Sequence, residues 1–227
     1  MKHGKKYTES IKKYNTADHY DLEKAVAIVK SAAYAKFDET VDISVKLNLK
    51  KSQSVRDTVV LPNQFRAEKR VLVFCKPEKE KEAQDAGAAF VGADDLIEKV
   101  KGGWTDFDIA VATPDMMKDV GKLGMVLGRK GLMPNPKTGT VSFDLKNTLA
   151  ELKKGRTEFR ADKTGVVHLA VGKVSMDSAK VAENIRVVIT EIKRKRPADA
   201  KGEFILTISV ASTIGPGVWV NVKDFGV

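Results

Sequence analysis

The residues of this chain that most suggest chemistry lie in one glycine-rich, basic segment, residues 121–141. The segment reads GKLGMVLGRKGLMPNPKTGTV and contains five glycines and two prolines. Its basic residues are Lys122, Arg129, Lys130 and Lys137. Glycine lets a backbone come close to a ligand, and basic side chains attract phosphates. A loop-like segment of this composition therefore suggests a phosphate-bearing partner, and the question is which kind.

The spacing of these residues does not support a nucleotide site. A P-loop requires G-x-x-x-x-G-K-[ST], and a dinucleotide site requires G-x-G-x-x-G at a turn from strand to helix. Neither pattern occurs in the chain. Gly121-Lys122 lacks the hydroxyl residue that should follow, and we expect a helix before it rather than a strand. The glycines are better interpreted as residues that end helices and permit tight turns.

Catalytic and metal-binding groups are equally sparse. The histidines, His3, His19 and His168, lack the spacing of metal ligands, and no Ser/His/Asp or Cys/His set stands out. Cys75 is the single cysteine and lies in the apolar run RVLVFC, which predicts a buried structural thiol. We therefore expect no enzymatic activity, no metal and no cofactor. The competing hypothesis is an enzyme with a nucleotide pocket in the middle of the chain.

The positive charge of the chain is concentrated in its two ends. The 227 residues carry a net charge of +10, which favours polyanionic partners, and 42% of them are hydrophobic, enough for a packed core. Residues 1–66 contribute +5, residues 160–227 contribute +4, and residues 67–159 contribute +1. If the ends fold together, they form one basic domain, and residues 67–159 form a near-neutral domain inserted into it.

The sequence also indicates where the protein works. No apolar run approaches the roughly 20 residues of a membrane helix, so we expect no membrane partner. The basic start of the chain lacks the apolar stretch of a signal peptide. Together with the single cysteine, this predicts a location in the reducing cytoplasm.

The two ends of the chain share one pattern of elements. Helices are predicted for residues 22–35, after Asp21 as a cap, and for residues 177–196. Residues 40–49 alternate between apolar and polar, which predicts a strand with one buried face. Further strands are predicted at residues 56–61, 157–161, 166–174 and 204–210. The ends therefore form helices packed on a half-exposed antiparallel sheet.

The middle of the chain follows a different pattern. Three apolar runs, RVLVFC, AAFVG and DFDIAVAT, predict buried strands. Predicted helices begin at Pro77, Asp94, Thr113 and Leu145. Buried strands that alternate with helices favour an open parallel or mixed sheet covered on both faces. The chain as a whole is thus expected to be α/β.

Three short stretches of the ends are candidates for contact with nucleic acid. Lys193–Arg196 reads KRKR and ends a helix, although such runs are more often solvated termini. Phe37 follows Lys36 directly; it is either a core residue or a surface ring that stacks on RNA. Residues 212–217, STIGPG, have hydroxyls and bare backbone that can approach a sugar-phosphate chain, or they form an ordinary turn.

Longer motifs resemble one known family. Residues 131–137, GLMPNPK, with VGKLG before them and GTV after, closely resemble the signature of the ribosomal protein L-one family of the large-subunit stalk. The similarity extends to KFDETV at residues 36–41, to residues 165–173 and to TIGPG at residues 213–217. The signature is long and unusual, so a chance match is not expected.

The resemblance implies a fold and a function. The family has a first α+β domain built from both chain ends and a second, Rossmann-like three-layer α/β domain inserted into it. Its members bind the stalk of 23S rRNA near the exit site of the large ribosomal subunit and influence release of deacylated tRNA. They also repress translation by binding a similar structure in their own operon mRNA.

The resemblance also implies which residues contact RNA. Carried over by matching position, they are Lys36, Phe37, Thr40, Lys46, His168, Lys173, Ser175, Thr213, Ile214, Gly215 and Pro216. The family motif commonly begins Thr-Met-Gly where this chain has Thr213-Ile214-Gly215. Isoleucine keeps the apolar bulk, so binding is expected to be retained. A secondary contact is expected at Lys122, Arg129, Lys130 and Lys137.

Overall fold

The computed structural model describes residues 4–50, 55–65, 69–136, 139–153, 155–197 and 202–225. The chain divides into two compact units. Met1–Phe65 and Thr157–Val227 form one, here called the terminal unit, and Arg66–Arg156 form the inserted unit. The terminal unit carries 23 Lys and Arg against 16 Asp and Glu, and the inserted unit 17 against 14. The positive charge is therefore concentrated in the terminal unit.

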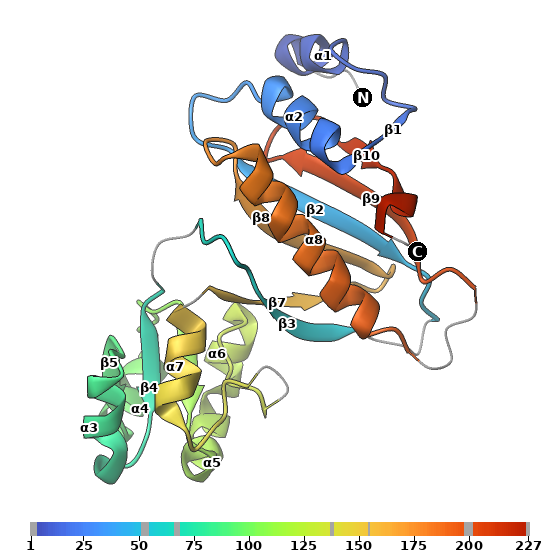
Figure 1. Ribbon diagram of the computed structural model, residues 1–227. Helices are drawn as coiled ribbons and strands as arrows, with labels where there is room; N and C mark the ends of the chain where they lie inside the picture. Colours follow the sequence, from blue (N-terminus) through green and yellow to red (C-terminus); the bar gives the residue numbers. More distant parts are fainter. Residues whose placement is uncertain are drawn as a thin grey trace. The chain divides into compact units, whose positions relative to one another are not determined.

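A five-stranded sheet organises the terminal unit (Figure 1). Its strand order is β1 (His19–Tyr20), β10 (Val218–Val220), β9 (Ile205–Ser212), β2 (Thr40–Leu47) and β8 (Val166–Lys173). Neighbouring strands are antiparallel except β1 and β10, which are parallel. The half-exposed antiparallel sheet that the sequence predicted is thus confirmed, with β1 and β10 added at one edge.

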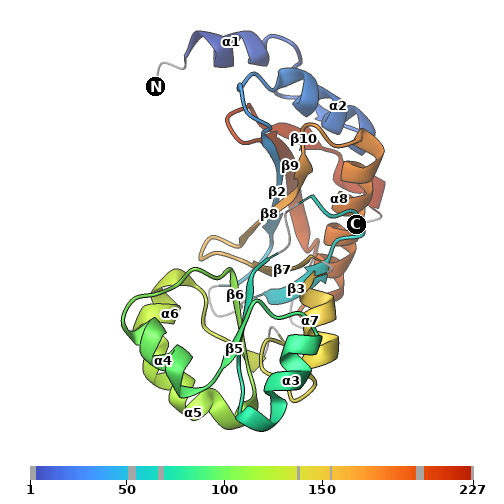
Figure 2. The same cartoon turned by 90° about the vertical axis from the view of Figure 1, so that its left-hand side faces the viewer.

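Two helices cover one face of this sheet. Val41, Ile43 and Val45 of β2 are fully buried and alternate with partly exposed residues. The buried face packs against α2 (Leu22–Ala32) and α8 (Ser178–Arg194), which lie side by side on the same side of the sheet (Figures 1 and 2). No helix of the described residues covers the opposite face, here called the open face. The terminal unit also has α1 (Lys5–Ile11) and the short helix η4 (Val222–Phe225), which we did not predict.

Strand β7 (Arg156–Arg160) pairs with β3 (Arg56–Val60) in a separate two-stranded sheet. A single antiparallel bridge, between Ala161 and Val167, joins the end of β7 to β8. Phe159 of β7 and Val59 of β3 are buried in the same core, and this shared burial selects the pairing. Residues 162–165 form a turn in which Asp162 accepts hydrogen bonds from the N–H groups of Thr164 and Val166, both at 2.8 Å.

The inserted unit has three layers (Figure 2). Its parallel sheet has the order β5 (Phe90–Gly92), β4 (Val71–Phe74) and β6 (Ile109–Ala112). One apolar cluster joins the sheet to α3 (Pro77–Asp85) and α7 (Leu145–Lys153), and a second joins it to α4 (Asp94–Lys101), α5 (Met117–Val120) and α6 (Gly124–Lys130). The short helix η1 (Pro114–Met116) leads from β6 into α5. Helices cover both faces, so the expected α/β arrangement is confirmed.

The glycine-rich segment is more helical than its composition suggested. It begins with the short helix η2 (Gly121–Leu123) and continues as α6, since Leu123 and Leu127 are buried on one side. The helix ends at Gly131, whose φ of 71° lies in the left-handed region that favours glycine. The loop-like part therefore starts only at Gly131.

Cys75 follows β4 and is fully buried. Burial raises the pKa of its thiol to about 11, and the nearby carboxylates of Glu80 and Glu82 act in the same direction. The interpretation of Cys75 as a structural thiol is consistent with this, because a thiol that stays protonated is a poor nucleophile. Among the described residues, no helix is long and apolar enough to cross a bilayer.

Candidate RNA-binding surface

Antiparallel pairing brings three loops together at one end of the five-stranded sheet. Strand β2 begins where β8 and β9 finish, so Thr40 lies opposite Lys173 and Val41 opposite Ser212. The connections at residues 33–39, 174–177 and 213–217 therefore meet at this end, here called the loop end. Nine of the eleven positions carried over from the resemblance lie there. They are Lys36, Phe37, Thr40, Lys173, Ser175, Thr213, Ile214, Gly215 and Pro216.

Asp38 joins the first of these loops to the second. Its carboxylate accepts hydrogen bonds from the backbone N–H of Ser175 at 3.1 Å and from the Ser175 hydroxyl at 2.8 Å. These bonds lower the pKa of Asp38. The Lys173 ammonium donates to the Asp38 carbonyl at 3.2 Å and to the Thr40 hydroxyl at 2.9 Å. Of the expected RNA contacts, Ser175 is therefore held by the Asp38 carboxylate, and Lys173 is held by the Asp38 backbone carbonyl and the Thr40 hydroxyl.

Glu39 joins the first loop to the third and is 1% exposed. One carboxylate oxygen accepts from the N–H groups of Tyr34 at 3.1 Å and Ala35 at 2.8 Å, and the other accepts from Ile214 N–H at 3.2 Å. Burial acts to raise the pKa of Glu39, but the Ser212 hydroxyl beside it and these N–H groups favour the charged form, so the pKa is lowered. The bonds to Tyr34 and Ala35 also explain why α2 ends at Ala32 and not at residue 35 as predicted.

Thr213, which follows β9, is joined to the start of β2 by its side chain. Its hydroxyl accepts from Thr40 N–H at 2.9 Å and donates to Thr40 C=O at 3.3 Å, so it replaces one step of the ladder of backbone hydrogen bonds. Tyr34 adds a hydrogen bond from its hydroxyl to Ile214 C=O at 3.2 Å. The backbone of the third loop is thus fixed from both sides.

A side chain at Gly215 would collide with the Ser212 hydroxyl, which gives a first prediction. A Cβ at this position would lie 2.3 Å from the buried Ser212 Oγ. Overpacking of this kind costs about 1–3 kcal/mol, so Gly215→Ala is expected to displace the third loop and weaken RNA binding about tenfold in a filter-binding assay. Gly217→Ala is the matched control, because no atom lies within 4 Å of its Cβ position. Equal affinity of both variants would contradict this account of the loop.

The fixed loops present a mixed basic and apolar surface. The side chains of Phe37 and Ile214 are 54% and 46% exposed, and Lys36 in the first loop is also exposed. Of the two interpretations of Phe37, the core position is wrong, because the ring stands at the surface. Pro216 is buried, so it shapes the loop and offers no side-chain surface to a partner.

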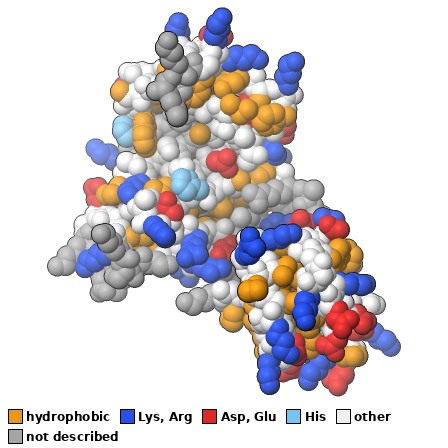
Figure 3. Space-filling view, turned by 180° about the vertical axis from the view of Figure 1, so that it is seen from behind, with side chains coloured by type: hydrophobic (Ala, Val, Ile, Leu, Met, Phe, Trp, Pro, Cys, Tyr) orange, Lys and Arg blue, Asp and Glu red, His pale blue; other side chains and the backbone are white. Residues whose placement is uncertain are grey.

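The two remaining positions, Lys46 and His168, lie on the open face away from the loop end. Lys46 is near the other end of β2, opposite Val166 and Thr207, and its ammonium contacts the Thr164 carbonyl. His168 is opposite Ser44, with 3.0 Å between His168 Nδ1 and Ser44 Oγ. Figure 3 shows the molecule from behind, with exposed histidine (pale blue) and basic side chains (blue) on the terminal unit.

Lys122, Arg129 and Lys130 of the glycine-rich segment lie in the inserted unit and are exposed. Lys122 forms an ion pair with Asp119 at 2.8 Å, which lowers the pKa of Asp119 and raises that of Lys122. Lys130 contacts the Thr105 hydroxyl, and Arg129 lies beside it at the end of α6. Lys137 lies outside the described residues.

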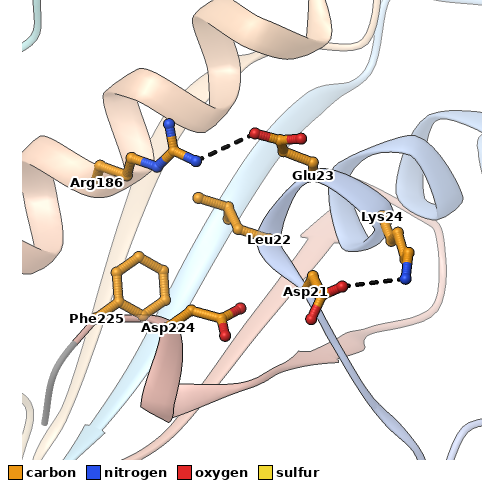
Figure 4. A pocket seen from close by; sticks show the side chains of 7 residues that line it. All are labelled: Asp21, Leu22, Glu23, Lys24, Arg186, Asp224 and Phe225. Carbon is orange, nitrogen blue, oxygen red and sulfur yellow. Dashed lines mark hydrogen bonds and ion pairs between the residues drawn. The ribbon is translucent and has the colours of Figure 1, made fainter.

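A pocket of about 270 Å³ lies between the start of α2, α8 and η4 (Figure 4). Three of its lining residues are acidic, Asp21, Glu23 and Asp224. Asp21 pairs with Lys24 at 3.1 Å and Glu23 with Arg186 at 3.2 Å, so both cations on the wall already have partners. Paired charges and a surplus carboxylate make this pocket unsuited to a phosphate.

The prediction that Asp21 caps α2 is only partly correct. Asp21 precedes α2, but its side chain makes no capping hydrogen bond.

Sequence reasoning missed the two acids that assemble the loop end. Asp38 and Glu39 stand beside Lys36 and Phe37, where carboxylates look like ordinary solvated charges. No local signal showed that Asp38 and Glu39 also have partners among residues 173–175 and 212–214, more than 130 positions away. The structure as a whole is a basic α+β unit interrupted by a second, α/β unit.

Comparison with known proteins identifies the family. Residues 29–216 match the model of the ribosomal protein L1p/L10e family. Large ribosomal subunit protein uL1 of Treponema denticola is 67% identical over 223 residues, which cover 98% of this chain and 99% of that protein. The proteins of the same name from Treponema pallidum and Borrelia hermsii are 61% and 57% identical over 99% and 97% of this chain, and over 99% and 98% of their own lengths. The chain therefore belongs to the ribosomal protein L1p/L10e family, and it is a structural RNA-binding component of the ribosome and not an enzyme.

Proposed function

We propose that the chain binds the stalk of 23S rRNA in the large ribosomal subunit through the loop end of the terminal unit. The observation that carries this proposal is that Lys36, Phe37, Lys173 and Ile214 lie together at the loop end, on segments that Asp38 and Glu39 join. An exposed ring and an exposed apolar side chain, held between lysines on rigid loops, suit a folded RNA with an unstacked base. The names of the relatives support the assignment to the large subunit.

Electrostatics supplies the less specific part of the binding. The net charge of the terminal unit is +7, counted over all its residues, and basic side chains that neutralise phosphates release counterions. The affinity is therefore expected to fall steeply as salt rises. The exposed Lys122, Arg129 and Lys130 of the inserted unit would add a secondary contact of this kind.

Two substitutions at the loop end test the proposal. Phe37→Ala removes a stacking surface, and Thr213→Ala removes both side-chain bonds to Thr40. Each is expected to cost about 1–3 kcal/mol of binding free energy in a gel shift with stalk rRNA at two salt concentrations. Phe143→Ala is the control for Phe37→Ala, because Phe143 is equally exposed, at 56%, but lies in the inserted unit.

The outcome that would overturn the proposal is clear. If Phe37→Ala and Thr213→Ala both fold and both bind stalk rRNA as tightly as the unaltered chain, the loop end is not the RNA site. A loss of affinity in Phe143→Ala of the same size would instead place the contact on the inserted unit.

The same surface would serve two further roles that the family resemblance suggests. Binding at the stalk near the exit site would aid release of deacylated tRNA, and binding to a similar structure in its own operon mRNA would repress translation. Because one surface serves all of these, Phe37→Ala should relieve repression of a reporter that carries the operon leader in the same proportion as it weakens rRNA binding. Relief of repression without loss of rRNA binding would show that the mRNA and the rRNA bind at different sites.

A further inference from the structure

A single row of side chains crosses the open face of the five-stranded sheet from edge to edge. His19 of β1 is paired with Trp219 of β10, and Trp219 with Ser209 of β9. Ser209 is paired with Ser44 of β2, and Ser44 with His168 of β8. Since paired residues point to the same side of a sheet, these five side chains form one continuous line.

Trp219 is exposed in a way that the fold does not require. Its neighbours Val218 and Val220 are fully buried, so the alternation of the strand turns the indole to the open face, where it is 39% exposed. The His19 ring lies beside it, with ring centroids 6.3 Å apart and planes tilted by 33°. A large ring left partly in water, with a second ring next to it, offers a flat surface for stacking.

The rest of the row suits a nucleobase. Ser209 and Ser44 are small, so no large side chain stands between the rings of Trp219 and His168. Their hydroxyls can both donate and accept hydrogen bonds. Trp219 and His168 are three strand spacings apart, roughly 14 Å. Sheets of the RRM type use aromatic residues on neighbouring strands to stack two or three bases in the same manner.

The charge of the open face and its continuity with the candidate RNA-binding surface favour RNA over another class of partner. Among the outward positions of the five strands, all of them described, Asp42 is the acidic residue, while Lys46 and Lys173 are basic. His168 and Lys46 already belong to the candidate RNA-binding surface. The row therefore extends that surface from β8 across the sheet to β1.

We propose that Trp219, flanked by His19, stacks on an unpaired nucleobase of the bound RNA and forms a second contact site on the open face. This inference rests on the proposed rRNA binding and adds a contact that the loop end does not supply. The occupant is a base in a single-stranded stretch of two or three nucleotides, lying along the row toward His168.

Tryptophan fluorescence of the full chain tests the proposal. The chain has two tryptophans, and Trp104 packs between Phe90 and Phe107 in the inserted unit, so Trp104→Phe leaves Trp219 as the sole reporter. A transcript of the 23S rRNA stalk segment is expected to quench Trp219 emission and to protect it from acrylamide. In binding assays, Trp219→Ala should lower affinity about tenfold, as for the loss of one stacked base, whereas Trp219→Phe should retain it within threefold.

Controls separate this inference from the proposed function. Val60→Ala is the matched variant, because Val60 is an apolar side chain of the terminal unit with 43% exposure and does not lie in the row. Unchanged Trp219 emission at saturating RNA, with Trp219→Ala binding within twofold of the unaltered chain, would overturn the inference while Phe37→Ala still shows loss. If Phe37→Ala also binds normally, the proposed function fails as well.

Discussion

Glu39→Gln is expected to weaken binding to stalk rRNA by about 2–3 kcal/mol although it removes a negative charge. The amide has one acceptor oxygen where the carboxylate has two. If that oxygen stays with Tyr34 and Ala35, an NH₂ group faces the N–H of Ile214, which then loses its acceptor. A hydrogen bond to a charged group contributes about 1.5–3 kcal/mol. The third loop should therefore detach from the first.

The expected loss of RNA affinity distinguishes a role in positioning the loops from a simple effect of charge. Glu23→Gln is the control, because Glu23 is an exposed acid on α2 in the same unit and its loss changes the net charge equally. Electrostatics alone predicts slightly tighter RNA binding for both variants. Tighter binding by Glu39→Gln in a filter-binding titration would show that the carboxylate has no role in positioning the loops.

Acid should reproduce the effect of Glu39→Gln. The pKa of Glu39 is lowered in the folded state from its ordinary value of 4.5, so its contribution to stability is complete above that value. This contribution is lost as the pH falls through the lowered value. Between pH 5 and 8 the loop end should therefore keep its geometry, and RNA affinity should not vary through this group.

Sequence patterns predicted the elements of the fold because burial leaves a local signature. The alternation of β2 and the apolar runs of β4 and β6 follow directly from one or two buried faces. The short strands β1 and β10 leave no such signature, since two or three residues cannot establish a period. Their pairing is what turns Trp219 to the open face, so the row across the sheet was not predictable.

The loop end shows a second limit of sequence patterns. Phe37 and Thr213 were indicated by their neighbours and by the family resemblance, but the contacts that fix them come from residues far away in the chain. Asp38 and Glu39 act through backbone N–H groups, which every residue possesses, and through serine hydroxyls, so no pairing of opposite charges reveals them. The glycine-rich segment shows the opposite: its unusual composition identifies the family, yet it lies in the less basic unit and not in the unit that forms the loop end.

Asn184 in α8 is the second position with a large expected effect. It is fully buried, its carbonyl oxygen accepts from Asn63 N–H at 3.0 Å, and its amide donates to Asn63 C=O at 2.9 Å and Val171 C=O at 2.7 Å. Asn184→Asp keeps the acceptor but turns a second oxygen toward two carbonyls. An uncompensated buried charge costs about 3–5 kcal/mol, so the terminal unit should lose that much stability at pH 7.

The pH dependence of this loss distinguishes the charge from a packing defect. Burial and the two carbonyls would raise the folded-state pKa of the new carboxyl above its ordinary value of about 3.9, since only the protonated form can donate. The penalty should therefore be small near pH 4 and grow as the pH rises through the folded-state pKa. Urea unfolding followed by Trp219 fluorescence, in the Trp104→Phe background, reports on the terminal unit alone. Asn15→Asp is the control, because its exposed oxygen keeps the bond from Ala17 N–H; a penalty for Asn184→Asp that is equal at pH 4 and pH 7 would refute the charge-based account.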